Sequence, residues 1–228
     1  MNELQNETNV EWFGELWTLL PERAVYWSSQ KTVILTDPHF GKDATFRSSG
    51  IAVPSGTTRR DLTRLGNVLD RYNPTRLLIL GDFFHAGSSK TNETLDFLRC
   101  WRQHYAGIEV VNIQGNHDKH AGDPPADLSI SVEMESWGIK SIRFAHHPDT
   151  NLGTPLVCGH LHPAIWIGRL RGSSGKLPCF WLTQQTMVLP AFGTFTGGAR
   201  PPISSGDRVF GICDNEVLEI PVLQHQGK

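Results

Sequence analysis

The stretch Leu156-Val157-Cys158-Gly159-His160-Leu161-His162 carries the strongest fold signal in this sequence. A short apolar run ends at a glycine, and two histidines follow at alternate positions. Short runs of aliphatic residues that end in turn residues are typical of buried strands. Alternate residues of an extended chain point to the same side, so both imidazoles are aimed in one direction. The stretch therefore predicts a buried strand that delivers two histidines to its end.

Four other apolar runs have the same form, an apolar segment followed by a loop that carries an acidic, amide or imidazole side chain. They are Thr32–Thr36 before Asp37 and His39, Leu77–Leu80 before Gly81 and Asp82, Ile108–Ile113 before Gly115-Asn116-His117-Asp118, and Ile142–Ala145 before His146 and His147. In open α/β sheets, ligands bind just beyond the carboxyl ends of the strands. We therefore expect the five loops to converge on one crevice.

Two helical patterns separate the early strands. Apolar residues recur at helical spacing in two segments, each behind candidate N-caps: Leu62–Tyr72 behind Thr57 and Thr58, and Leu95–Trp101 behind Thr91 and Asn92. Alternating strands and helices favour α/β layering. The first half of the chain is therefore expected to form an α/β unit.

After His162 the pattern changes to short segments that predict antiparallel strands: Ala164–Leu170, Leu177–Leu182, Met187–Phe192, Arg208–Ile212 and Val217–Ile220. The stretch from Trp12 to Trp17 predicts an additional hairpin near the N-terminus. Linkers at 171–176 and 193–206 are too short to divide the chain. We therefore interpret residues 1–228 as one domain with its core at about 11–221.

Composition excludes several classes of protein. Of the 228 residues, 39% are hydrophobic and 19% charged, which is typical of a globular chain. The net charge of −2 gives no bulk attraction to a polyanion. The first 22 residues hold no basic residue and no apolar run is long enough to span a bilayer, so we expect a cytoplasmic protein without a secretory signal or membrane segment. The four cysteines form no CxxC pair, which indicates that they are reduced thiols.

The polar residues of the five loops are the part of the sequence that indicates a chemical function. Each loop alone is compatible with an ordinary turn aspartate or a hydrogen-bonded core histidine. Several buried histidines and carboxylates in one crevice, however, need a common partner to offset their desolvation, and divalent cations supply it. The five loops together therefore favour a metal site.

The ordered set Asp37-Pro38-His39, Gly81-Asp82, Gly115–Asp118, His146 and Gly159–His162 resembles the signature of the calcineurin-like metallophosphoesterases. Further stretches resemble its bacterial PdeM subgroup, described as ligase-associated DNA-damage-response endonucleases: Leu20–Ala24, His39–Lys42, Leu80–His85, Leu161–Ala164 and Leu189–Gly193. The resemblance spans roughly Glu11 to Ile220, with Pro38 and Phe40 as small departures beside the ligands. It implies a four-layer α-β-β-α sandwich.

The resemblance also implies a role for each polar residue. Asp37, His39 and His162 would hold one metal, Asn116, His146 and His160 would hold the second, and Asp82 would bridge them. His117 would face the scissile phosphate and either stabilise its charge or protonate the leaving oxygen, although it could instead only orient a ligand. His147 is the alternative to His146, because neighbouring strand residues face opposite ways.

The donor set agrees with this assignment. Two-metal sites need ions roughly 3.5–4 Å apart, which takes a bridging carboxylate. Nitrogen and oxygen donors without thiolate fit Mn²⁺, Zn²⁺ or iron, and we expect Mn²⁺. Hydrolysis would then proceed by attack of a metal-bridging hydroxide on phosphorus.

Candidate substrate contacts lie close to the metal loops in sequence. Lys42 and Arg47 follow the first loop and Lys119 follows the third. A helical stripe of Arg60, Arg64 and Arg71 is either a track for a nucleic-acid backbone or a solvated helix face, and we favour the solvated face.

We therefore expect a phosphodiesterase that acts on DNA, with DNA-repair or ligase-associated proteins as partners. The subgroup resemblance alone supports the DNA substrate. The alternatives are a phosphatase, a cyclic-nucleotide hydrolase or a nucleotide-pyrophosphate hydrolase on the same site, or a non-catalytic metal-bound platform.

Overall fold

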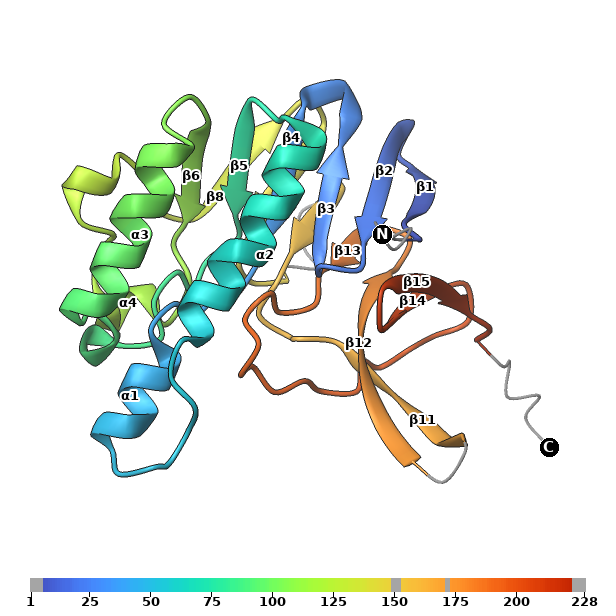
Figure 1. Ribbon diagram of the computed structural model, residues 1–228. Coiled ribbons are helices and arrows are strands. Elements are labelled where there is room, and N and C mark those ends of the chain that lie inside the picture. The colour runs from blue at the N-terminus through green and yellow to red at the C-terminus, as the bar shows by residue number, and fades with distance from the viewer. Residues whose placement is uncertain (1–5, 149–152, 171–172, 223–228) are drawn as a thin grey trace.

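The apolar runs pair into two β-sheets that pack against each other, as shown in the computed structural model, which describes residues 6–148, 153–170 and 173–222 (Figure 1). The strands of the first sheet lie in the same order in space as along the chain: β1 (Thr8–Trp12), β2 (Glu15–Leu20), β3 (Ala24–Trp27), β4 (Thr32–Leu35), β5 (Arg76–Ile79), β6 (Glu109–Ile113) and β7 (Ser131–Glu133). Neighbours from β1 to β4 are antiparallel, whereas β4 to β7 are parallel.

The second sheet contains the remaining strands of the described chain: β8 (Ser136–Ile139), β9 (Ile142–Ala145), β10 (Leu156–Cys158), β11 (Ala164–Leu170), β12 (Ser173–Leu182), β13 (Thr186–Val188), β14 (Arg208–Cys213) and β15 (Glu216–Ile220). Their spatial order is β15-β14-β12-β13-β10-β9-β8, and β11 pairs only with β12. Strands β9, β10 and β13 run parallel. The carboxyl ends of β9 and β10, like those of β4 to β6, carry the predicted site loops.

Within the described residues, helices cover the outer face of the first sheet and not that of the second. The helices of the described chain are α1 (Lys42–Ser48), α2 (Thr57–Tyr72), α3 (Asn92–His104) and α4 (Asp118–Ala121), with one-turn 3₁₀ segments η1 (Ser28–Gln30), η2 (Gly87–Ser89) and η3 (Ala126–Leu128). The apolar stripe of α2, including Leu65 and Leu69, packs on buried residues of β4 and β5 such as Val33 and Leu77. These helices form the crossovers that parallel strands require.

Large aromatic side chains fill the space between the sheets. Trp17 and Trp27 of the first sheet stack with ring centroids 4.7 Å apart, and Trp27 also contacts Phe144 of the second sheet. Phe180 and Phe210 complete this buried layer. Burial of this aromatic surface stabilises the packing of the two sheets against each other.

The outer face of the second sheet is covered by a loop and a hairpin instead of helices. Ile203 packs there against Trp181 and Val209, and every helix in the described ranges precedes β7. Most neighbours in this sheet are antiparallel, and antiparallel neighbours do not require a helical crossover. The predicted α/β class with two packed sheets is confirmed, and this sheet has a non-helical cover over the described residues. None of the helices in these ranges is long and apolar enough to span a membrane.

Predicted and observed elements differ where tertiary contacts determine how a helix begins. The N-terminal hairpin is confirmed as β1–β2, and Thr91 caps α3 by accepting a hydrogen bond from the Thr94 backbone N–H at 3.2 Å. The cap predicted for α2 is wrong, because the helix begins after Gly56 and Thr58 Oγ1 instead accepts from the Gly41 backbone N–H. Helix α1 has no counterpart among the predicted elements.

Two predicted boundaries in the second sheet also move. The strand expected to end at Phe192 ends at Val188, since Phe192 donates its backbone N–H to Thr36 O at the other sheet. Within the expected linker 171–176, residues 171–172 lie outside the described ranges and β12 already begins at Ser173.

Candidate active site

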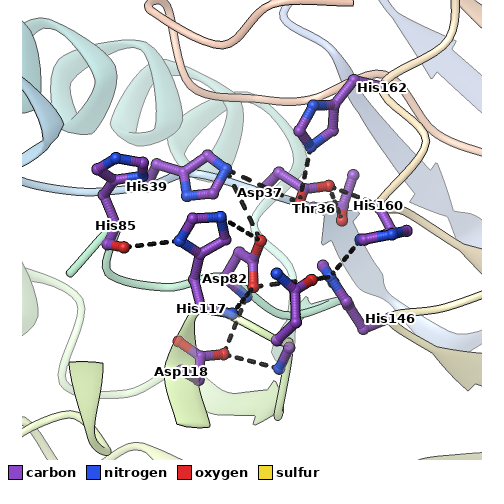
Figure 2. A network of polar contacts seen from close by, with 12 residues as sticks. Thr36, Asp37, His39, Asp82, His85, His117, Asp118, His146, His160 and His162 are labelled. Atoms are coloured by element: carbon purple, nitrogen blue, oxygen red, sulfur yellow. Dashed lines mark hydrogen bonds and ion pairs between the residues drawn. The ribbon is translucent and has the colours of Figure 1, made fainter. Parts of the chain in front are cut away.

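The loops after β4, β5, β6, β9 and β10 bring together the side chains predicted as metal ligands, and Figure 2 labels all of them except Asn116. They are Asp37, His39, Asp82, Asn116, His146, His160 and His162. Three of the loops come from the first sheet and two from the second. The site therefore lies at the shared carboxyl edge of both sheets, as expected for α/β layering.

One group of donors surrounds Asp37. Its Oδ1 lies 3.0 Å from His162 Nε2 and 4.0 Å from His39 Nε2. Both Asp37 Oδ1 and His162 Nε2 are buried atoms without a hydrogen bond of acceptable geometry. Buried polar atoms are normally satisfied, so this pair is the kind of exception that an ion explains.

A second group surrounds His146. Its Nε2 lies 2.9 Å from Asn116 Oδ1 and 3.2 Å from His160 Nδ1. Its Nδ1 donates to Leu80 O at 2.8 Å, which fixes the ring and leaves Nε2 free of a proton in the neutral form. Such a backbone partner is common behind a metal-binding histidine.

Asp82 lies between the two groups. Its Oδ1 is 3.6 Å from His146 Nε2, and its Oδ2 is 3.8 Å from His39 Nε2. Burial and the charge of Asp37 raise the pKa of Asp82 to about 7. Burial also raises the pKa of Asp37, but His162 and His146 outweigh it, so the pKa of Asp37 lies below its usual value.

The two carboxylates shift in opposite directions. Burial and the nearby charge of Asp37 disfavour the ionised form of Asp82, whereas the neighbouring histidines favour the ionised form of Asp37. A bound divalent ion would reverse this for Asp82, because it is the largest charge in such a site. Two carboxylates, four imidazoles and one amide oxygen are a donor set that fits divalent transition metals.

The backbone at the site is held in an uncommon conformation. Five of the seven residues have positive φ angles, between 45° and 64°: Asp37, His39, Asp82, His160 and His162. Residues other than glycine rarely adopt this region, and clusters of them occur at functional sites. The fold therefore imposes these conformations to aim the side chains.

Glycines permit the close approach of the loops. A Cβ on Gly115 would lie 2.2 Å from Asp82 Oδ1, and one on Gly159 would lie 1.7 Å from Thr36 Oγ1. Both distances are far below contact. The glycine before Asn116 and the glycine before His160 are thus steric requirements of the site.

His117 borders the donors without joining either group. Its Nε2 is 4.0 Å from Asp82 Oδ2, and its Nδ1 donates to His85 O at 2.7 Å. With 36% of its side chain exposed, it lies on the open side of the cluster. The ring of His85 stacks on it with centroids 4.8 Å apart. This geometry places Nε2 beside the donors while part of the side chain stays accessible to solvent.

Two residues near the site were not predicted. The buried Asp118 accepts hydrogen bonds from three backbone N–H groups, those of Asp82, Phe83 and Gly115, each at 2.9 Å. His85 supports His117 through its carbonyl and its ring. Their sequence signal was only proximity, since each lies in the same short loop as a predicted ligand.

His147 departs from the expected geometry. Its ring is exposed but lies 4.1 Å from the ring of His160 and 4.7 Å from that of His146. The expectation that it faces away from the site is wrong, because the chain leaves the strand at Ala145 and strand alternation ends there. His146 is buried, and ring nitrogens of His146, His147 and His160 lie close enough together to hold one ion, so His147 joins this group of donors.

The predicted substrate residues are placed differently from one another. Lys42 begins α1 and lines a narrow crevice with His39, and burial lowers its pKa. Arg47 is paired with Asp43 at 3.0 Å on the same helix. Lys119 is exposed on α4, next to the loop of Asn116 and His117.

The arginine stripe on α2 is a solvated face only in part. Arg64 pairs with Asp61 at 3.1 Å and donates to Phe192 O, and Arg71 pairs with Glu22 at 2.8 Å. Arg60 and Arg71 are exposed, whereas Arg64 is half-buried. The preferred interpretation is therefore wrong for Arg64, and Arg71 lies on the solvated face while it pairs with a neighbouring loop.

Residues 30–173 match the family model for calcineurin-like phosphoesterases. The fold is similar to the crystal structure of the Pseudomonas putida nuclease MPE, with 36% sequence identity, a TM-score of 0.83, and coverage of 94% of this chain and 100% of that one. Yfce, a phosphoesterase from E. coli, aligns at 12% identity and a TM-score of 0.38 over 83% of this chain and 97% of its own. A search among curated proteins finds no match.

The family match spans more than half of the chain, and the similarity to the nuclease spans nearly all of it. Members of this family depend on divalent metals, and the histidine and aspartate cluster lies where such metals would bind. The chain therefore belongs to the calcineurin-like phosphoesterase family and is a metal-dependent phosphoesterase.

Proposed function

We propose that this phosphoesterase uses two divalent ions, Mn²⁺ first among them, to cleave phosphodiester bonds in DNA. The observation that carries the proposal is the position of Asp82, whose two carboxylate oxygens face different groups of donors. A single carboxylate in that position is what a pair of ions needs in order to lie close together.

Asp37, His39 and His162 would hold the first ion, and Asn116, His146 and His160 the second. When bound, the ions polarise the phosphate and lower the pKa of water so that it attacks at neutral pH. Imidazole, carboxylate and amide donors suit Mn²⁺, Zn²⁺ and iron better than Ca²⁺.

The protein's own contribution to the chemical step is the orientation of His117. The hydrogen bond from its Nδ1 to His85 O fixes the ring and directs Nε2 toward the open side of the donors. From there, a protonated His117 can stabilise charge on the phosphate or give its proton to the leaving oxygen. The ring stacking of His85 restricts the alternative rotamers of His117.

DNA as substrate is supported by the likeness to the Pseudomonas putida nuclease and by the positions of Lys42 and Lys119 beside the site loops. Arg47 is a weaker candidate because Asp43 neutralises it. We further propose that the protein acts in the cytoplasm during DNA repair, with ligase-associated repair proteins as partners.

Metal analysis followed by a substrate screen tests the proposal. The screen contains plasmid DNA, single-stranded DNA, small chromogenic diesters and monoesters, cyclic nucleotides and dinucleoside pyrophosphates, each with added Mn²⁺. We expect two ions per chain and cleavage of DNA. Turnover of a small nucleotide without DNA cleavage would instead indicate a hydrolase of small phosphoesters, and metal without any turnover would indicate a non-catalytic platform.

A further inference from the structure

A polar pocket lies beside the candidate metal ligands. It borders His162, has a volume of about 210 Å³, and is lined by Arg23, Lys176, Thr194 and Thr196 among others. Within the part of the chain that the structure describes, two cations and no carboxylate line the pocket. Its charge therefore favours an anionic ligand.

The wall of this pocket is hydrogen-bonded to two loops of the metal site. Gly193 donates its backbone N–H to Asp37 O at 3.1 Å, and Ala199 donates to His162 O at 3.0 Å. A Cβ on Gly198 would lie 2.8 Å from Ala164 Cβ, so the wall approaches the hairpin as closely as a glycine allows. The pocket is consequently held at a constant position relative to the donors.

Arg23 is the deeper of the two cations. Its partly buried side chain makes no hydrogen bond or ion pair with any residue in the described ranges. Its neighbour Arg64 already forms an ion pair with Asp61 and donates a hydrogen bond to Phe192 O. Burial and the charge of Arg64 lower the pKa of Arg23, yet a guanidinium stays protonated. An anion in the pocket would give it a partner.

The hairpin extends the pocket with an exposed aromatic ring. Cross-strand pairs join Ala164 to Pro178 and Trp166 to Lys176. Alternate strand residues share a face, so Trp166 and Lys176 lie on the same face as the pocket-lining Ala164 and Pro178. Trp166 is 62% exposed, and the Lys176 Nζ lies 5.4 Å from its ring centroid. The hairpin projects from the second sheet (Figure 1).

We propose that the pocket and Trp166 form a subsite for one unpaired nucleotide of a DNA strand, next to the scissile phosphate. Arg23 and Lys176 hold the flanking phosphate, and the base stacks on Trp166. Stacking tolerates any base because every base has a π face, and Arg and Lys are the usual partners of backbone phosphates. This inference rests on the proposed action on DNA. It further specifies that the DNA strand runs from the metal site into the pocket and along Trp166.

The test compares Trp166→Ala and Lys176→Glu with two matched controls. Phe13→Ala removes another exposed aromatic ring, and Lys31→Glu reverses another exposed lysine, both away from the pocket. Binding of a short fluorescent single-stranded oligonucleotide is measured in EDTA by anisotropy. The KM for its cleavage with Mn²⁺ is then compared with the KM for a small chromogenic diester.

We expect Trp166→Ala to weaken oligonucleotide binding by about 5-fold to 100-fold, the usual worth of one stacked base, and to raise the oligonucleotide KM relative to that of the diester. Lys176→Glu should have an effect in the same direction. Both controls should behave like the wild type. An oligonucleotide with an abasic position opposite Trp166 should bind wild type and Trp166→Ala equally, since no base remains to stack.

Two results would overturn the inference in distinguishable ways. If the wild type cleaves the oligonucleotide but neither variant changes its binding or KM, the subsite is wrong and the proposed function stands. If the wild type neither binds nor cleaves the oligonucleotide, the subsite and the DNA substrate are both wrong.

Discussion

At the scale of single residues, Asp82 has the most demanding position, because one carboxylate faces both donor groups. Asp82→Asn keeps the shape but removes the charge and replaces one oxygen with an amide that repels a cation. Loss of a residue that only orients a ligand costs 10-fold to 100-fold in metal affinity or activity, so we expect a loss of at least about 100-fold here. Mass spectrometry of the bound metal measures the loss of affinity, and the rate of diester hydrolysis measures the loss of activity. A folded variant with two ions and full activity would contradict the bridging role.

His117 should separate metal binding from chemistry, since its partly exposed side chain borders the donors without joining either group. We expect His117→Ala to retain its metal and to lose about 10²-fold to 10⁴-fold in rate, the usual contribution of a positioned acid. The loss should be larger for a diester with a poor leaving group than for a nitrophenyl ester, which needs no proton. Equal rates for wild type and variant on the poor leaving group would leave His117 as a residue that only orients a ligand.

At the scale of structural elements, Asp118 joins the loop after β5 to the loop after β6. Its buried carboxylate accepts three backbone hydrogen bonds, which Asp118→Ala would leave without a partner. We expect the free energy of unfolding to fall by about 3 kcal/mol or more, given 1.5–3 kcal/mol for each hydrogen bond to a charged group. Urea denaturation measures the loss. The exposed Asp123→Ala serves as the control, and equal midpoints for the two variants would contradict the role of Asp118.

Glu15 links β2 to the turn between β8 and β9. Its carboxylate accepts from Trp27 Nε1 at 2.9 Å and pairs with Lys140. The hydrogen bond from Lys140, followed by those from Ser29 and Trp27, lowers the pKa of Glu15 to about 2. A depressed pKa in the folded state means that the stabilisation is present above the ordinary value of 4.5 and is lost as the pH falls toward 2.

We therefore expect Glu15→Gln to reduce stability by about 1 kcal/mol at neutral pH, because Lys140 is largely exposed and the pair is screened. The difference between wild type and variant should shrink when urea melts are repeated from pH 5 to pH 2.5. A difference that stays constant over this range would show that the charge of Glu15 contributes nothing.

The strands were predictable and the loop conformations were not. The strand Ile142–Ala145 was predicted with its observed bounds, since a buried apolar run between turn residues has few other solutions. The positive φ angles at Asp37 and His39 depend on contacts with another loop, including the hydrogen bond from His39 N to Asp82 O at 3.0 Å. Such distant contacts leave no local signal, which is also why α1 and the orientation of His147 were missed.

At the scale of the whole molecule, the site depends on both sheets at once. Asp82 follows a strand of the first sheet and His146 a strand of the second, yet their donor atoms are 3.6 Å apart. The aromatic layer between the sheets fixes this distance. These contacts support the proposal that residues 1–228 fold as one domain with its core at about 11–221.

The net charge of −2 also determines how the molecule would bind DNA. With no bulk attraction, a few local cations must supply the electrostatic affinity, and Arg47, Arg64 and Arg71 are already paired with acidic residues. Two to four phosphate contacts correspond to a slope of about −2 to −4 for log K against log salt on duplex DNA.

Lys119, exposed beside His117, should be one of these contacts. We expect Lys119→Glu to make the slope shallower by about one, because one phosphate contact is lost, and Lys31→Glu to leave it unchanged. Anisotropy titrations across a series of salt concentrations measure both slopes. A slope in the wild type as steep as about −8 would mean that the binding surface extends far beyond the loops of the metal site, because each further unit of slope requires about one more cation on the DNA backbone.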